Sequence, residues 1–277
     1  DGLTLYAADY GPKDSDTVIL CMHGLTRNHK DFEPMMEGLG LEARFISVDV
    51  RGRGKSDRDP SGATYQPPLY AQDMAALMAH LKLDKVILIG TSMGGLMAML
   101  MAKAFPEKIR GIVMNDVGPE VNPAGLKRIA GYAGGNEIFD SWGDAAAAIG
   151  QTQASVYPEY GEEDWMAFAR RTCVERADGK VVFDYDPVIV QGMGSTTPGW
   201  RVNFAMWRVF AARKSIPLLI IRGETSDILT DKTARRMQRR HKGSALLTVP
   251  GRGHTPFLDE PQSLDAIRDF IRSLGSA

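Results

Sequence analysis

The sequence predicts an α/β fold, with a mostly parallel, doubly wound sheet flanked by helices and a helical segment inserted late in the chain. Short apolar runs alternate with helix-forming stretches over residues 17–115 and again over residues 217–274. Such alternation is typical of parallel strands joined by helical crossovers. It lapses over residues 120–213, which hold all four tryptophans and many loop signals. We therefore predict a core domain of residues 1–119 and 214–277 and a helical cap insertion of residues 120–213.

The individual elements follow from hydrophobic periodicity and from start and stop residues. Near-continuous apolar runs, as expected of strands covered on both faces, predict strands at residues 17–22, 44–49, 85–89, 109–115, 217–222 and 245–249. Helices are predicted at residues 32–39, with Asp31 as the cap, and at residues 96–104, 231–241 and 261–274. Another helix begins near Pro68, and helix-like pieces of the insertion lie at residues 145–149, 164–171 and 202–212.

Length and charge limit the classes of partner. A chain of 277 residues suits one large domain, or a core domain that carries an insertion. The net charge of −1 gives no reason to expect nucleic acid or an anionic membrane as a partner. No apolar run approaches the roughly 20 residues that cross a bilayer. We therefore expect a small-molecule substrate to be the partner.

The cysteines and the first residues bear on compartment and processing. Cys21 lies in an apolar strand and Cys173 in the insertion, so we expect both to be reduced, which favours a cytoplasmic location. Asp1-Gly2 is typical of a two-residue hairpin turn before a strand at residues 3–10. Because no strand precedes this turn, we expect the chain to begin within a hairpin. Whether a leader segment has been removed stays open.

The most informative stretch is Gly90-Thr91-Ser92-Met93-Gly94, which joins the strand at residues 85–89 to a helix. A serine between two glycines at a sharp strand-to-helix turn is the setting of a nucleophile elbow. The glycines are expected there because the two backbones pass close to the serine. Taken alone, the stretch fits an ordinary Ser-Gly turn equally well. The prediction that Ser92 is a nucleophile therefore depends on finding its base and acid.

A serine hydroxyl needs an adjacent base, which is itself held by a third group. Among five histidines, His254 lies in a glycine-flanked loop just past the last strand, and chemistry in parallel sheets gathers at such strand ends. His80 and His241 end helices and His29 is expected to be exposed. We therefore predict His254 as the base.

The third group is expected at another strand end. Asp227 closes Gly223-Glu224-Thr225-Ser226-Asp227, directly after the strand at residues 217–222, and is our first choice. Asp116 also follows a strand, at residues 109–115, and is the more serious competitor. Glu224 and Asp231 stay open as further alternatives.

Acyl transfer also needs donors for the developing oxyanion. The amide of Met93 follows the nucleophile and opens a helix, and we assign the second amide to Leu25 in His23-Gly24-Leu25. The His23 side chain is expected to brace this loop. Gly54-Lys55-Ser56 lacks the earlier glycine of a phosphate-binding loop, and the chain has no H-E-x-x-H or C-x-x-C. We therefore expect no cofactor and no metal.

Taken in order, these motifs resemble the α/β-hydrolase superfamily in its serine-nucleophile branch. The resemblance is carried by His23-Gly24-Leu25, V-D-V-R-G-R-G-K-S at residues 48–56, the G-T-S-M-G elbow, R-G-E-T-S-D at residues 222–227 and G-R-G-H at residues 251–254. It implies an α/β-hydrolase fold with a helical cap, a triad of Ser92, Asp227 and His254, and oxyanion amides of Leu25 and Met93. Ser92 argues against the epoxide hydrolase and dehalogenase branches, which use an aspartate nucleophile.

Within the serine branch, the sequence is similar to bacterial carboxylesterases, enol-lactonases and hydrolases of C–C bonds in ring-fission products. It predicts a cofactor-free serine hydrolase that cleaves a small or medium carboxylic ester or lactone through an acyl-enzyme. The alternatives are a C–C bond hydrolase or an enol-lactonase. Two alternatives of other kinds are a non-catalytic ligand-binding protein on the same fold and peroxidase-type chemistry with an acyl donor.

Substrate specificity is expected to reside in the cap. Trp142, Phe204 and Trp207 are the candidate substrate-binding residues, and each fits the core of the cap equally well. Arg201 and Arg208 either bind a substrate carboxylate, which favours an enol-lactonase, or lie on a solvated face.

Overall fold

The structure, a computed structural model, describes residues 1–190, 199–212 and 215–275. A seven-stranded sheet with the order β1-β3-β2-β4-β5-β9-β10 lies at its centre. β1 pairs with β3 in antiparallel register at one edge, and the other neighbouring strands are parallel. The strands are β1 (Ala7–Tyr10), β2 (Val18–Met22), β3 (Arg44–Val48), β4 (Val86–Thr91), β5 (Ile109–Asn115), β9 (Leu218–Gly223) and β10 (Ala245–Val249).

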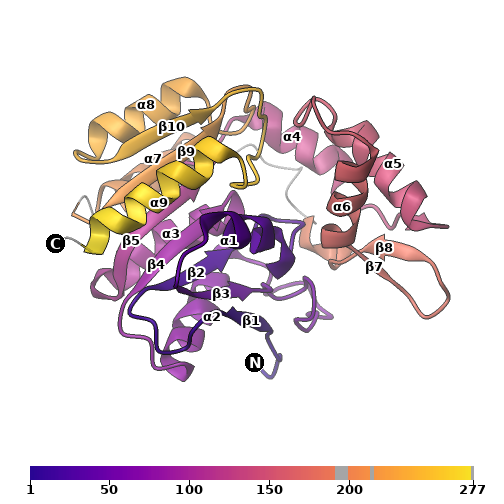
Figure 1. The fold of residues 1–277 in the computed structure, drawn as a ribbon, viewed down its shortest axis with the longest axis horizontal. Coiled ribbons are helices and arrows are strands. Elements are labelled where there is room, and N and C mark those ends of the chain that lie inside the picture. The colour runs from indigo at the N-terminus through magenta and orange to yellow at the C-terminus, as the bar shows by residue number, and fades with distance from the viewer. Residues whose placement is uncertain (191–198, 213–214, 276–277) are drawn as a thin grey trace.

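Helices cover both faces of this sheet (Figure 1). One face packs against α1 (Glu33–Leu39) and α9 (Pro261–Gly275). The other face packs against α2 (Pro67–His80), α3 (Met93–Ala104), α7 (Trp200–Ala211) and α8 (Asp231–Arg240). The predicted α/β fold, with a mostly parallel, doubly wound sheet, is confirmed.

The burial of β2 shows why its sequence is apolar throughout. Leu20 and Met22 pack in the cluster that includes α2 and α3, whereas Ile19 and Cys21 pack in the cluster of α1 and α9. Successive side chains of a strand point to opposite faces, so a strand covered on both faces has no position that faces water. This is the physical basis of the strand predictions.

The first helical segment begins earlier than the sequence predicted. A 3₁₀ turn, η1 (His29–Phe32), precedes α1, and the side chain of Asn28 accepts a hydrogen bond from the Lys30 amide at 3.0 Å. Asn28 is therefore the cap, because its carbonyl oxygen reaches a free amide of the first turn. The prediction of Asp31 as the cap is wrong, since Asp31 lies inside the turn.

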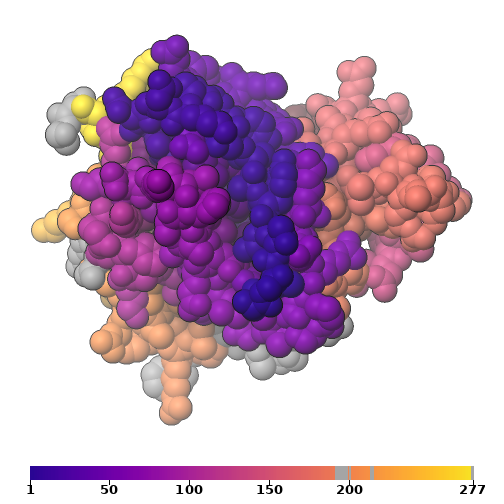
Figure 2. Space-filling view, turned by 90° about the horizontal axis from the view of Figure 1, so that it is seen from below, coloured from indigo at the N-terminus to yellow at the C-terminus, as the bar shows by residue number. Residues whose placement is uncertain are grey.

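The cap comprises residues 123–190, between β5 and α7, and lies at one side of the sheet (Figures 1 and 2). Its helices are α4 (Pro123–Tyr132), α5 (Trp142–Gln153) and α6 (Glu162–Thr172), and a short turn η3 (Pro187–Val190) follows. It also contains a three-stranded sheet of β6 (Ile138–Phe139), β7 (Cys173–Glu175) and β8 (Val181–Phe183), which the sequence did not predict. Strands of two or three residues are too short to show a period of two.

The cap has a hydrophobic core of its own, and α7 is not part of it. α5 and α6 enclose Ala145, Ile149 and Phe168, whereas Trp207 and Phe210 of α7 pack in the cluster that contains α2 and α3. The last predicted helix of the insertion therefore packs on α3, in the helix layer that covers one face of the main sheet. The division of the chain at residues 120 and 213 stays a prediction.

Two further expectations concern cysteines and membranes. Cys21 and Cys173 are both free thiols, and both are buried. Burial raises the pKa of Cys173 to about 11, so its thiol is neutral near pH 7. Within the described ranges, no helix has the length and apolar character needed to span a bilayer.

Candidate active site

Ser92 lies at the turn between β4 and α3, in a backbone conformation that is rare for residues other than glycine. Its φ is 51° and its ψ is −111°. A Cβ atom on Gly90 would meet the backbone of Gly94, and one on Gly94 would meet the carbonyl group of Met22. Because the backbones are in contact at both glycines, the surrounding structure holds the strained turn. The elbow predicted from the sequence is present, with Ser92 at its apex.

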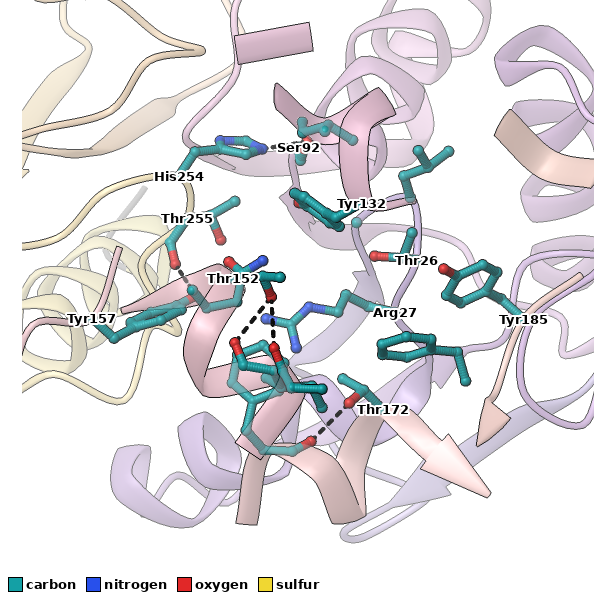
Figure 3. Close-up of a pocket in the computed structure, with 18 of the residues that line it drawn as sticks. Thr26, Arg27, Ser92, Tyr132, Thr152, Tyr157, Thr172, Tyr185, His254 and Thr255 are labelled. Carbon is teal, nitrogen blue, oxygen red and sulfur yellow. Dashed lines mark hydrogen bonds between the residues drawn. The ribbon is translucent and has the colours of Figure 1, made fainter. Parts of the chain in front are cut away.

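A chain of hydrogen bonds connects Ser92 through His254 to the buried Asp116. Ser92 Oγ lies 2.9 Å from His254 Nε2, and Figure 3 shows the two side chains facing each other. His254 Nδ1 lies 2.7 Å from Asp116 Oδ2. A carboxylate only accepts hydrogen bonds, so Nδ1 carries the proton and Nε2 is free to accept from the Ser92 hydroxyl. This is the geometry that general-base activation of a serine requires.

Asp227, the first choice for the acid, does not contact His254. Its carboxylate accepts from Arg128 of α4, with Nε–Oδ2 at 2.6 Å and Nη2–Oδ1 at 2.8 Å. Partial burial is the largest single effect and raises the pKa of Asp227, but the hydrogen bonds and the positive charge of Arg128, with smaller contributions, together hold the pKa below its ordinary value. The structure therefore places Asp116, the competing candidate, where Asp227 was predicted.

Hydrogen bonds from the end of β9 and from the loop after it hold the Asp116 carboxylate beside His254. Asp116 Oδ1 accepts from the Gly223 amide at 3.0 Å, and Oδ2 accepts from Ser226 Oγ at 2.5 Å. The Asp116 side chain is fully buried, whereas Asp227 is one-third exposed. The turn directs Ser226 inward to Asp116 and the next residue, Asp227, outward to the cap. Asp116 and Asp227 follow adjacent strands, so the sequence alone placed both at one edge of the sheet.

The other two candidate acids have partners elsewhere. Glu224 Oε2 accepts from the Gly251 amide at 2.9 Å, which supports the turn after β10. Asp231 Oδ2 pairs with Arg235 Nε at 2.7 Å on the surface of α8. In the described structure, neither carboxylate has a hydrogen bond to His254.

Arg53 supports the two residues whose amides are candidates for the oxyanion hole. Its Nε donates to the carbonyl oxygen of Leu25 at 2.9 Å, and its Nη2 lies 3.6 Å from Met93 Sδ. The Arg53 side chain is almost fully buried, and burial lowers the pKa of its guanidinium. The sequence alone did not indicate this role for Arg53. The available signal was an arginine within the V-D-V-R-G-R-G-K-S loop, and only the fold shows what it contacts.

The His23 side chain braces the loop His23-Gly24-Leu25, as predicted. The Val50 amide donates to His23 Nε2 at 3.0 Å, so the proton is on Nδ1, which donates to the Gly24 carbonyl at 2.6 Å. Burial lowers the pKa of His23 to about 4. The neutral ring is therefore the form that fits this site, because a protonated Nε2 has no lone pair to accept from Val50.

Acidification is expected to weaken the fold through His23. Below pH 6.5 the unfolded chain protonates this residue, while the folded chain excludes the proton until about pH 4, so stability falls with pH over that range. Between pH 7 and pH 5 we expect His23 to account for a loss of about 2 kcal/mol. Urea unfolding at both pH values measures this loss, which His23→Gln should reduce. The exposed His80→Gln is the matched control, and an equal loss in His23→Gln and wild type would refute the assignment.

A cavity of about 200 Å³ opens beside Ser92 and His254 (Figure 3). The loop of residues 24–27 forms one wall, and the cap forms the other. Tyr157 connects the cap to the loop that carries His254, because its hydroxyl donates to the Thr255 carbonyl at 2.7 Å. The cavity is therefore covered by the cap, as expected for a substrate site. Cap residues that line it include Ile149, Thr152, Tyr157, Phe168 and Tyr185.

The three cap residues predicted to bind substrate lie elsewhere. Trp142 Nε1 donates to Glu175 at 2.8 Å, Phe204 is 61% exposed, and Trp207 is buried in the cluster that contains α2 and α3. Phe204 and Trp207 lie away from the cavity because α7 packs on α3, and Trp142 lies away from it at the start of α5; helical periodicity does not show which surface a helix will cover. Arg201 and Arg208 lie on the exposed side of α7, outside the lining of this cavity.

Comparison with known proteins shows the family to which the chain belongs. Residues 17–261 match the family model described as the alpha/beta hydrolase fold. The chain is 33% identical over 268 residues to the 3-hydroxybutyrate-oligomer hydrolase of Cupriavidus necator, covering 95% of this chain and 91% of that protein. The chain therefore belongs to the α/β-hydrolase family, as its motifs predicted.

Two further relatives extend the comparison. A 2-(acetamidomethylene)succinate hydrolase of Mesorhizobium japonicum is 28% identical over 264 residues, which cover 94% of this chain and 89% of that protein. The crystal structure of an alpha/beta hydrolase from Novosphingobium aromaticivorans superposes with a TM-score of 0.90 at 42% identity, covering 98% of this chain and 94% of that one. The family and the named activities of these relatives support hydrolase chemistry.

Proposed function

We propose that the protein is a serine hydrolase that cleaves a small carboxylic ester or lactone through an acyl-enzyme. The observation that carries the proposal is the hydrogen-bonded chain of Ser92, His254 and Asp116 at a cavity covered by the cap. A nucleophile, a base and a buried carboxylate in this order are what acyl transfer requires. In this proposal, Asp116 takes the role that the sequence assigned to Asp227.

The reaction follows from these contacts. His254 Nε2 takes the proton of Ser92 Oγ as the oxygen attacks the substrate carbonyl, and the Asp116 carboxylate stabilises the imidazolium that forms. The amides of Leu25 and Met93 donate to the oxyanion. His254 then protonates the leaving oxygen, and the C–O bond breaks. In the second half, His254 activates water, which releases the acid and regenerates Ser92.

The dimensions of the cavity favour a small substrate. A volume of about 200 Å³ lies below the range of typical drug-sized ligand sites, so short acyl groups fit best. Short oligomers of 3-hydroxybutyrate are the first natural candidate, given the similarity to the Cupriavidus necator hydrolase. The alternative reaction is cleavage of a C–C bond or of an enol-lactone. The proposed location of the enzyme is the cytoplasm.

Covalent labelling tests the proposal directly. A fluorophosphonate probe is expected to modify Ser92, located by peptide mass spectrometry, because His254 activates this hydroxyl. Ser273, whose hydroxyl donates only to the Phe270 carbonyl among the described residues, is the internal control and should stay unlabelled. Short p-nitrophenyl esters of two to four carbons should be hydrolysed at least about tenfold faster than the twelve-carbon ester. A folded protein that takes no label and hydrolyses no ester would instead be a binding protein.

A further inference from the structure

A cationic side chain lies in the same cavity as the nucleophile. Arg27 follows the loop that carries Leu25, and it lines the cavity together with Ser92 and His254. Arg27 Cγ and Ser92 Cβ lie 3.7 and 3.8 Å from the point where a Cβ on Gly24 would stand. The two side chains therefore flank the same glycine. Figure 3 shows the Arg27 side chain extending from there into the cavity.

The guanidinium of Arg27 has unused donors. Its nearest acidic partner in the described part of the chain is Asp31, at 3.5 Å from Nη1 to Oδ1. Both of these atoms are buried and have no hydrogen-bond partner among the described residues. Buried charged donors are costly when they are unsatisfied, and native proteins rarely leave them so. Nη1 is enclosed beside Asp31, whereas Nε and Nη2 make no hydrogen bond among the described residues and are not enclosed in this way, so a ligand that enters the cavity can supply their acceptor.

Aromatic contacts orient this guanidinium. Its central carbon lies 4.1 Å from the ring centre of Phe168 and 4.8 Å from that of Phe257. Contacts with aromatic faces hold a planar guanidinium while leaving its N–H edge available. That edge matches the two oxygens of a carboxylate in a bidentate arrangement.

Other polar groups of the cavity do not compete for the same role. Thr152 Oγ1 donates to carbonyl oxygens of its own helix, and Thr172 Oγ1 donates to the Phe168 carbonyl at 2.9 Å. Glu137, an acidic residue of the lining, is exposed and makes no ion pair with Arg27 in the described structure. Arg27 is therefore the group in the lining best suited to bind an anion.

We propose that Arg27 binds a carboxylate of the substrate, so that the enzyme selects short esters or lactones that carry a free carboxylate. This inference rests on the proposed serine-hydrolase function. The carboxylate would bind at Arg27 while the scissile carbonyl meets Ser92 on the other side of Gly24. Because both residues line one cavity of about 200 Å³, we expect a substrate with only a few bonds between its carboxylate and the carbonyl.

Two matched substrate pairs test the proposal and show which part of the substrate carries the carboxylate. Monomethyl glutarate and methyl pentanoate differ in the charge of the acyl part. 3-Acetoxybutyrate and its methyl ester differ in the charge of the alcohol part. We expect wild type to prefer the anionic member of at least one pair, with the preference in KM. In Arg27→Gln, the anionic-to-neutral ratio of kcat/KM should fall about 10- to 100-fold, the range for hydrogen bonds to charged groups.

A second arginine variant serves as the control. Arg208→Gln, which removes an exposed cation on α7, should keep the wild-type ratio. Equal losses on both members of each pair in Arg27→Gln would overturn the proposal and leave the hydrolase function intact. Calorimetric titration with glutarate provides a readout that needs no turnover. Binding to wild type that weakens at least tenfold in Arg27→Gln supports the carboxylate site even if no ester is cleaved, and unchanged binding overturns it.

Discussion

Asp116→Asn is expected to lower kcat by about a thousandfold to ten-thousandfold, whereas Asp227→Asn should keep it within about tenfold. Asp116 accepts the Nδ1 proton of His254 at 2.7 Å, which leaves Nε2 free for Ser92. An amide at this position presents its NH₂ group to the ring and favours the wrong tautomer. The measurement is steady-state hydrolysis of a short p-nitrophenyl ester by both variants.

Asp227→Asn should act through the cap. The carboxylate of Asp227 joins the loop after β9 to Arg128 of α4, and both side chains are about one-third exposed. Partly exposed ion pairs contribute on the order of 1 kcal/mol or less, so a small drop in the melting temperature is expected. Arg128→Gln removes the same ion pair and is the matched control, which should resemble Asp227→Asn.

The reverse outcome would identify Asp227 as the acid. A large loss of kcat in Asp227→Asn, with a small one in Asp116→Asn, would mean that His254 exchanges partners during turnover. Circular dichroism excludes unfolding as the cause of either loss. Asparagine at position 116 retains one oxygen that can accept from Gly223 or Ser226, so we expect this variant to fold.

Ser92→Ala is expected to lower kcat by about 10⁵- to 10⁶-fold, since loss of a nucleophile removes the covalent route altogether. Alanine has the same backbone preference as serine at φ 51°, so the elbow should persist. The unchanged cavity should still bind glutarate, which calorimetry measures. Turnover within tenfold of wild type would show that ester cleavage does not pass through Ser92.

Ser226→Ala tests whether Ser226 only supports the Asp116 carboxylate, and it is measured in the same ester-hydrolysis assay. Ser226 donates to Asp116 without contacting the cavity, so its loss should weaken the orientation of the acid by a smaller factor than either main variant. A loss of kcat on the order of tenfold is expected from the removal of the charge-assisted hydrogen bond to Asp116, and the amides of Ile228 and Leu229 also lose Ser226 Oγ as their acceptor. A loss as large as that of Ser92→Ala would contradict a supporting role.

The candidate site was predicted in part from the sequence, and the errors have one cause. Ser92 and His254 were predicted as nucleophile and base because local patterns show where strands end, and strand ends of a parallel sheet meet at one edge. The same rule placed Asp116 and Asp227 at that edge together. The choice between them depended on hydrogen bonds from Gly223 and Ser226, more than 100 residues from Asp116 along the chain. No local pattern reports such contacts.

By itself, the sequence determined the sheet, its flanking helices and the elbow, because strands buried on both faces and sharp glycine turns depend on local residue types. The tertiary structure alone decided which carboxylate meets His254 and which cap residues line the cavity. It also decided that Arg27 extends into that cavity with unused donors. These outcomes depend on which surfaces pack together, and packing partners come from distant parts of the chain.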